Sequence, residues 1–213
     1  MKTDDLLDML SAGDVRVQRK PPYRAIVAAL AIGGAAAVIV SFAILGFRTD
    51  LAEVGAAGFV VMKLSFTVGV IALAFLFLTR LTRPGGEHRT RPALLVLPFV
   101  AIAALGLINL SFAPPAHWEA MVLGDQWLEC LLSIPIIGIV PFVVAIWAVR
   151  KGAPTDLRLA GAAAGLFAGG VSATAYAFHC IDDSLPFVTL WYGRTILLCT
   201  LAGAALGPRL LRW

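Results

Sequence analysis

The sequence predicts an all-α fold, specifically a polytopic membrane protein whose six transmembrane helices form a bundle with both termini in the cytoplasm. The chain of 213 residues is 60% hydrophobic and only 14% charged, with a mean hydropathy of +0.88. Soluble domains average about 45–50% apolar and about 25% charged residues. The apolar residues gather in six runs, each near the roughly 20 residues that a helix needs to cross the hydrocarbon core. Basic residues fall almost entirely on one side of these runs.

The six apolar runs divide the chain into a short arm and a membrane bundle. Residues 1–23 form a polar N-terminal arm without the character of a cleavable signal peptide, and residues 24–213 form the bundle. The loops are too short for a folded soluble domain. In chain order, the predicted spans are 25–47, 55–79, 93–112, 127–149, 157–178 and 185–206.

The loop charges predict the orientation of the bundle. All of the 17 Lys and Arg residues except Arg48, Lys63 and Arg194 lie in the arm, in the second and fourth loops, or at the C-terminus. Because cytoplasmic loops carry the excess of basic residues, both termini are predicted to be cytoplasmic. The net charge of +4 is explained by this bias, so it does not predict direct binding to nucleic acid. Cys130 and Cys180 then lie at the outer edge of the membrane.

Two basic residues fall inside predicted spans. Lys63 and Arg194 each lie about nine residues into a span, where a charge costs a few kcal/mol unless it has a partner or reaches the interface. Snorkelling to the interface is the first expectation for Arg194. Pairing of Arg194 with Asp182, Asp183 or Glu129 is a second hypothesis.

The outward cysteines can carry chemistry. Cys130 opens the fourth span and Cys180 closes the fifth, so two antiparallel helices can bring their thiols together. A disulfide is reasonable on the oxidising outer side of a bacterial inner membrane. Alternatively, the two thiols can bind zinc, cadmium or copper(I) transiently. A structural disulfide and two unrelated thiols fit the sequence equally well. The candidate supporting ligands are His117, Glu129, His179, Asp182 and Asp183.

Small residues mark a helix-packing face on the fifth span. Gly161, Gly165 and Gly169 recur every four residues, a spacing that lets helix backbones approach closely in lipid. We interpret this pattern as tight packing within the bundle. The pattern does not predict an oligomeric state. Cys199, deep in the sixth span, is interpreted as a small packing residue.

The N-terminal arm begins with a short amphipathic pattern. Thr3 can cap a helix whose first turn is acidic, and Gly13 suits its end. Such a helix is too short to be stable alone, and its acidic face disfavours anionic lipid. We therefore predict that it binds a protein partner. The residues expected to make the contact are Asp4, Asp5, Leu6, Leu7, Asp8 and Leu10.

Several motifs along nearly the whole length resemble a known family. They are Met1–Asp8, Arg48–Leu51, Arg150–Pro154, Ala173–Cys180 with the acids that follow, and Trp191–Gly193. With these motifs the chain resembles the NrsF family of six-span anti-sigma factors, which are negative regulators of an extracytoplasmic-function (ECF) sigma factor.

The resemblance implies a regulatory protein rather than an enzyme. Members of this family hold a sigma factor at the inner membrane and release it under stress. Heavy metals and oxidants are the stimuli linked to the family, and two outward cysteines are required for the response. In this chain those positions match Cys130 and Cys180. The partners implied are an ECF sigma factor and the lipid bilayer.

Two other functional classes fit the sequence less well. A small transporter or channel is the first alternative, but the spans show no pair of broken helices at corresponding positions. Pro135 and Pro141 are the nearest feature of that kind. A membrane thiol oxidoreductase is the second alternative, and the absence of a Cys-x-x-Cys pair disfavours it.

Overall fold

The computed structural model describes residues 22–49, 54–86 and 91–212. Six helical segments in this part of the chain are long and apolar enough to cross a membrane, and the described residues contain no strand. The predicted all-α class with six spans is confirmed. The cytoplasmic location of the termini stays a prediction. The described helices are α2 (Pro22–Ile44), α3 (Val54–Leu81), α4 (Leu97–Phe112), α5 (Trp118–Leu123), α6 (Trp127–Ile137), α7 (Ile139–Arg150), α8 (Leu157–Tyr176), α9 (Leu185–Phe187) and α10 (Gly193–Leu210).

The fourth and sixth spans are less regular than the sequence predicts. The fourth is divided into α6 and α7 at Gly138, between Pro135 and Pro141, because a proline inside a helix removes a backbone donor and crowds the preceding turn. The sixth begins with α9 and one π-helical segment, Val188–Tyr192, before α10. The connection before the fourth span was predicted only as a loop, but it contains a 3-10 turn, Pro115–His117, and α5.

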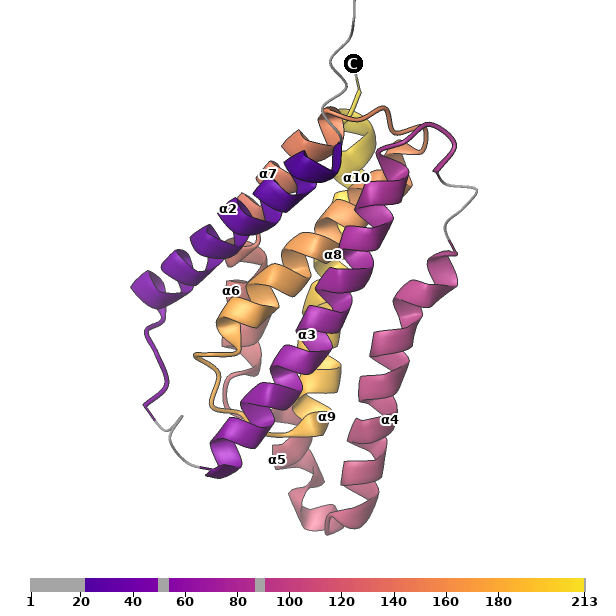
Figure 1. Cartoon of the computed structure of the whole chain (residues 1–213). Coiled ribbons are helices and arrows are strands. Elements are labelled where there is room, and N and C mark those ends of the chain that lie inside the picture. The colour runs from indigo at the N-terminus through magenta and orange to yellow at the C-terminus, as the bar shows by residue number, and fades with distance from the viewer. Residues whose placement is uncertain (1–21, 50–53, 87–90, 213) are drawn as a thin grey trace, which may run out of the picture.

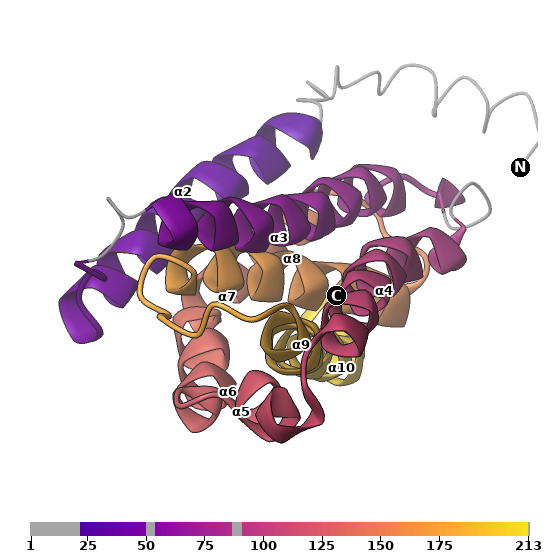
Figure 2. The same ribbon diagram turned by 90° about the horizontal axis from the view of Figure 1, so that it is seen from below.

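Helix α8 is the centre of the bundle. In the most apolar 18-residue stretch of α8, 83% of the residues are buried. In the corresponding stretch of the peripheral span that contains α4, only 11% are buried. Helices α2, α3, α7 and α10 surround α8 when the bundle is viewed along its length (Figure 2). The small side chains of α8 allow this close packing, because Gly and Ala let neighbouring backbones approach.

Glycines make the contact between α8 and α10 especially close. A Cβ atom added to Gly161 would lie 2.3 Å from the carbonyl oxygen of Gly203, and one added to Gly165 would lie 2.2 Å from that of Cys199. The third glycine of the pattern, Gly169, lies against Ile196. The three glycines that the sequence singled out therefore form an intramolecular helix contact.

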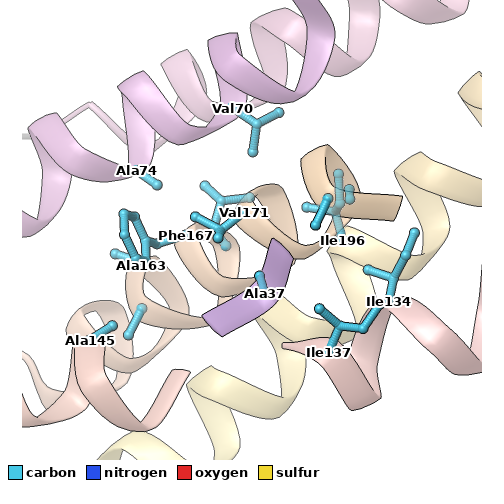
Figure 3. Close-up of a cluster of buried hydrophobic side chains, with 14 of the residues drawn as sticks. Ala37, Val70, Ala74, Ile134, Ile137, Ala145, Ala163, Phe167, Val171 and Ile196 are labelled. Atoms are coloured by element: carbon cyan, nitrogen blue, oxygen red, sulfur yellow. The ribbon is translucent and has the colours of Figure 1, made fainter. Parts of the chain in front are cut away.

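Larger side chains fill the spaces around this contact. Phe167 and Val171 of α8 point towards Val70 and Ala74 of α3 (Figure 3). Ile134 and Ile137 of α6 and Ile196 of α10 belong to the same buried cluster. Side chains from every long helix around α8 thus share one apolar core.

The bundle has two distinct ends. The start of α2 and the end of α10 lie at one end, where the C-terminus is marked in Figure 1. The first turn of α3, the α5 region, the first turn of α6 and the segment between α8 and α9 lie at the other end (Figure 1). We call the latter the cysteine end, because it contains Cys130 and Cys180.

Candidate functional site

Hydrogen bonds join the start of α6 to the segment Ala177–Ser184, here called segment 177–184. The backbone N–H of Ile181 donates to Gln126 Oε1 over 3.0 Å, and His179 Nε2 lies 3.2 Å from Glu129 Oε1. These contacts lie on either side of Cys180 and next to Cys130. Both thiols are free and fully buried. The structure therefore brings together the two cysteines that the sequence placed at one membrane depth.

Asp182 fastens segment 177–184 to the same helix start. Its carboxylate accepts the backbone N–H of Asp125 over 3.1 Å and that of Gln126 over 2.7 Å. These donors precede α6, whose first N–H groups have no partners within the helix. A carboxylate is a good acceptor there, because it also meets the positive end of the helix dipole.

Asp183 binds two buried cations on the opposite side of the segment. Arg48 Nη1 and Nη2 donate to its two carboxylate oxygens over 3.0 and 2.7 Å, and Lys63 Nζ donates to Oδ1 over 2.9 Å. The side chains of Arg48 and Lys63 are 1% and 0% exposed, against 19% for Asp183. We call these three residues the ion triad.

The ion triad also holds the backbone of Cys180. The carbonyl oxygen of Cys180 accepts from Arg48 Nη1 over 3.1 Å and from Lys63 Nζ over 2.9 Å. The backbone N–H of Arg48 donates to the backbone carbonyl oxygen of Phe178 over 3.2 Å. One of the two cysteines is thus fixed through its own peptide group by residues that follow α2 and belong to α3.

The surroundings shift the pKa of Asp183 and of Cys180, both in segment 177–184. Burial opposes ionisation of Asp183, but hydrogen bonds from Arg48 and Lys63 outweigh it and hold the pKa of that carboxyl below its usual value. Burial raises the pKa of the Cys180 thiol, and the nearby Lys63 ammonium partly opposes that rise. The thiol of Cys180 is therefore protonated at neutral pH in this conformation.

Three hydroxyl groups surround the two thiols. The hydroxyl of Tyr192 faces the Cys180 thiol, and that of Thr195 faces the Cys130 thiol. The ring of Tyr176 is tilted against the rings of His179 and Tyr192, with ring centroids 5.8 and 6.0 Å apart. Among the described residues, the buried hydroxyls of Tyr176 and Tyr192 have no hydrogen-bond partner. Buried polar groups without a partner are uncommon, so the hydrogen-bonding capacity next to the thiols is only partly used.

The candidate supporting ligands lie apart from one another. Glu129 pairs with His179, Asp182 meets the start of α6, and Asp183 belongs to the ion triad. His117 is exposed in its 3-10 turn. Within the described ranges, no three His, Cys, Asp or Glu residues are grouped in a way that can hold a metal ion. The two thiols with their neighbouring hydroxyls are the remaining donor set.

The two basic residues within spans have different environments. Lys63 is fully buried and paired with Asp183, so its charge is compensated inside the bundle. Arg194 is exposed, and in the described part of the chain Asp183 pairs with Arg48 and Lys63 instead. The hypothesis that pairs Arg194 with Asp183 is therefore wrong, because a loop cation and a cation of the second span fill that position.

Sequence reasoning missed the roles of Arg48, Tyr176 and Tyr192. Arg48 is the one basic residue in a loop predicted to face outward, a signal that it has a specific acidic partner. The two tyrosines fall in motifs noted for resemblance, but nothing in their spacing shows that they flank the cysteines. The acidic arm, with Asp4, Asp5, Leu6, Leu7, Asp8 and Leu10, lies outside the described residues.

Comparisons with known proteins agree with the motifs. The family model described as NrsF, "Negative regulator of sigma F", matches residues 10–213. The chain belongs to the NrsF family. It is 34% identical over 213 residues to a probable anti-sigma-F factor NrsF from Azospira oryzae, and 35% identical over 215 residues to the anti-sigma-F factor NrsF from Caulobacter vibrioides. Each alignment covers 100% of both chains. No solved structure matches the chain.

Membership in the NrsF family covers every element of the candidate site. The matched range includes Arg48, Lys63, Cys130 and the whole of segment 177–184. The relatives are named as regulatory factors rather than enzymes. Both thiols are fully buried, so neither is open to a dissolved substrate in this conformation.

Proposed function

We propose that this NrsF-family protein is an anti-sigma factor that holds an ECF sigma factor at the bacterial inner membrane. The observation that carries the proposal is the match to the family over residues 10–213, together with full-length similarity to two named anti-sigma-F factors. Both termini are proposed to be cytoplasmic, in accordance with the basic loops. The partner would then meet the end of the bundle that contains the start of α2.

We propose that the acidic arm makes the main contact with the sigma factor. Asp4, Asp5 and Asp8 with the leucines between them give an amphipathic helix that gains stability on a partner groove. The basic residues of the inner loops extend this surface, and direct binding to nucleic acid is not part of the proposal.

Cys130 and Cys180 are proposed to sense the stimulus. Both thiols are fully buried, and the hydroxyls of Tyr192 and Thr195 face them. An oxidant such as hydrogen peroxide would convert the two thiols to a disulfide and be reduced to two molecules of water. A thiophilic cation such as cadmium, zinc or copper(I) would instead replace the two thiol protons. Either reaction draws the two sulfurs together.

Co-purification of the full-length protein with its sigma factor tests the proposal. The wild-type protein in detergent should retain the sigma factor and lose it after treatment with hydrogen peroxide or cadmium chloride. Deletion of residues 2–12 should abolish retention. Replacement of both Cys130 and Cys180 by serine should leave retention intact and abolish release, whereas Cys199→Ser should behave as the wild type.

The two treatments separate the two chemistries. If only peroxide releases the sigma factor, the site is an oxidation sensor, and release by cadmium alone identifies a metal sensor. Retention of the sigma factor after deletion of the arm would contradict the proposed contact. Normal release from the double serine variant would contradict the sensor assignment.

A further inference from the structure

The ion triad at the cysteine end joins three parts of the bundle at one peptide group. Arg48 follows the end of α2, Lys63 belongs to α3, and Asp183 belongs to the segment that carries Cys180. Both cations donate to the Cys180 carbonyl oxygen as well as to Asp183. Any displacement of Cys180 therefore acts on two long helices at once.

Burial makes the contacts of the triad difficult to break singly. Lys63 is fully buried, and an ammonium group without a partner in such a place is strongly unfavourable. If the Cys180 carbonyl and Asp183 move away, Lys63 has to follow them or find water. The triad therefore favours two discrete arrangements, formed and broken, over a continuous range of strained ones.

The two cysteines differ in the backbone that carries them. Cys130 lies within α6, and its N–H donates to the carbonyl oxygen of Gln126. Cys180 lies in segment 177–184, which has no regular helix between Tyr176 and Leu185, although its N–H donates to the carbonyl oxygen of Tyr176 over 3.0 Å. A reaction that draws the two sulfurs together will displace the peptide group of Cys180 before it displaces a helix.

The two helices held by the triad lead to the opposite end of the bundle. Helix α2 runs from Ile44, shortly before Arg48, back to Pro22 at the opposite end, and α3 runs from the cysteine end to Leu81 (Figure 1). The hydroxyl of Ser41 in α2 also donates to the carbonyl oxygen of Ala175 in α8 over 3.3 Å. Release of the triad removes the side-chain contacts of Arg48 with segment 177–184, and α2 then keeps the Ser41 bond, the bond from the Arg48 N–H to Phe178, and its packing against neighbouring helices.

We propose that Arg48, Lys63 and Asp183 form a latch, which holds the bundle in the conformation that binds the sigma factor and opens when Cys180 reacts. The three latch residues are positioning residues that act through the Cys180 peptide group. This inference rests on the proposed function and adds the connection between its sensor and its output. By linkage, a stimulus releases the partner only if it favours the state that binds the partner poorly, and the open latch is that state.

The first test uses Lys63→Met, which keeps a long side chain but removes the charge. Without any stimulus, the variant should bind the sigma factor at least about 5-fold more weakly than the wild type, the lower limit of typical coupling between sites. Lys63→Arg should restore binding because it keeps a cation. Arg194→Gln is the matched control: it removes the other cation within a span, which is exposed and lies outside the latch.

The second test places Lys63→Met in the chain that also carries Cys130→Ser and Cys180→Ser. The latch acts after the thiols, so this chain should bind weakly although its sensor is absent. A defect that merely removed thiol reactivity would instead give tight binding without release. Tight binding by this combined variant would overturn the latch. If Lys63→Met does not accumulate in the membrane, Arg48→Gln tests the same loss of a latch cation, at the residue that follows α2.

A distance measurement separates failure of the latch from failure of the proposed function. Spin labels placed at the inner ends of α2 and α3 should show the same change in separation for Lys63→Met and for oxidised wild type. An unchanged separation in Lys63→Met overturns the latch whatever the sigma factor does. Failure of the wild-type protein to retain any sigma factor overturns the proposed function, and the separation still decides whether the triad links Cys180 to the two helices.

Discussion

Removal of Asp183 should destabilise the bundle far more than removal of Lys63, although the two residues form one ion pair. Asp183→Asn leaves the fully buried ammonium of Lys63 without a carboxylate partner. Loss of one partner from a buried pair costs about 3–5 kcal/mol. Asp183 is 19% exposed, so water can reach part of the site, and we expect a value near the lower limit, about 3 kcal/mol.

Lys63→Met removes the same ion pair but leaves a smaller defect. Asp183 keeps both of its hydrogen bonds to Arg48, and no buried ammonium remains to be compensated. The lost hydrogen bonds to Asp183 and to Cys180 contribute about 1.5–3 kcal/mol where a charge is involved. The desolvation cost of Lys63, several kcal/mol for a buried ion, is removed as well. The net change in the free energy of unfolding should be about 1 kcal/mol or less.

Unfolding of the purified protein in mixed micelles, followed by helical circular dichroism as SDS is increased, measures both values. The double variant Lys63→Met with Asp183→Asn should be more stable than Asp183→Asn alone, because no ammonium is then left unpaired. The coupling energy of the cycle should be about 1 kcal/mol or more. A Lys63→Met variant as unstable as Asp183→Asn would refute this reasoning, since the cost would then lie in lost contacts and not in an uncompensated charge.

Four further outcomes follow from the packing and the hydrogen bonds. Gly165→Ala should lower the free energy of unfolding in the SDS titration by about 1–3 kcal/mol or more, because the new Cβ would lie 2.2 Å from a carbonyl oxygen of α10. Gly34→Ala, where the same atom would meet nothing within 4 Å, should change it by less than about 1 kcal/mol, and equal effects would contradict the assigned contact. Tyr176→Phe should leave the reduced protein as stable or slightly more stable in the same titration, because its buried hydroxyl has no partner in the described structure; a clear loss would reveal a hydrogen bond to that group. Asp182→Ala should cost about 0.5–2 kcal/mol through loss of the acceptor for two N–H groups before α6, with faster hydrogen exchange at those amides as the direct measurement. Ionisation of Asp183 stabilises the fold fully above its unfolded pKa of about 3.9, and this stabilisation is lost as the pH falls through its lower folded pKa. The free energy of unfolding should therefore not change between about pH 5 and 8 on account of this group. Asp183→Asn should reduce the loss of stability below about pH 4.

The number and length of the spans could be predicted because they follow from hydrophobicity and helix rise alone. Apolar runs of the right length give six spans whatever their neighbours are, and the described residues contain six such helical segments. The details within the spans depend on backbone hydrogen bonding and packing. The division at Gly138 has a visible sequence cause in Pro135 and Pro141. The π-helical segment Val188–Tyr192 has no equally clear cause in the sequence.

The candidate site was only partly predictable, for a related reason. The proximity of Cys130 and Cys180 could be predicted from the order of the spans. Cys130 begins the fourth span and Cys180 ends the fifth, so both lie at the same end of two antiparallel helices. The partner of Asp183 could not be predicted, because three basic residues were available near that face and the choice depends on how α2, α3 and α8 pack. Arg194 has the right depth but an exposed position, whereas Lys63 lies on the face of α3 that packs towards segment 177–184.

The location of Lys63 constrains how a signal can leave the cysteine end. A buried cation in a span costs free energy that ordinary packing does not require, and a methionine would fill the same volume without that cost. The triad therefore contributes specificity of conformation more than net stability. Its hydrogen bonds converge on the carbonyl oxygen of Cys180, one residue whose side chain can react and whose peptide group holds two helices. In the proposed latch, chemistry at the thiol and movement of α2 and α3 are coupled at that one residue, so a variant that keeps both thiols but loses the cation should separate sensing from release.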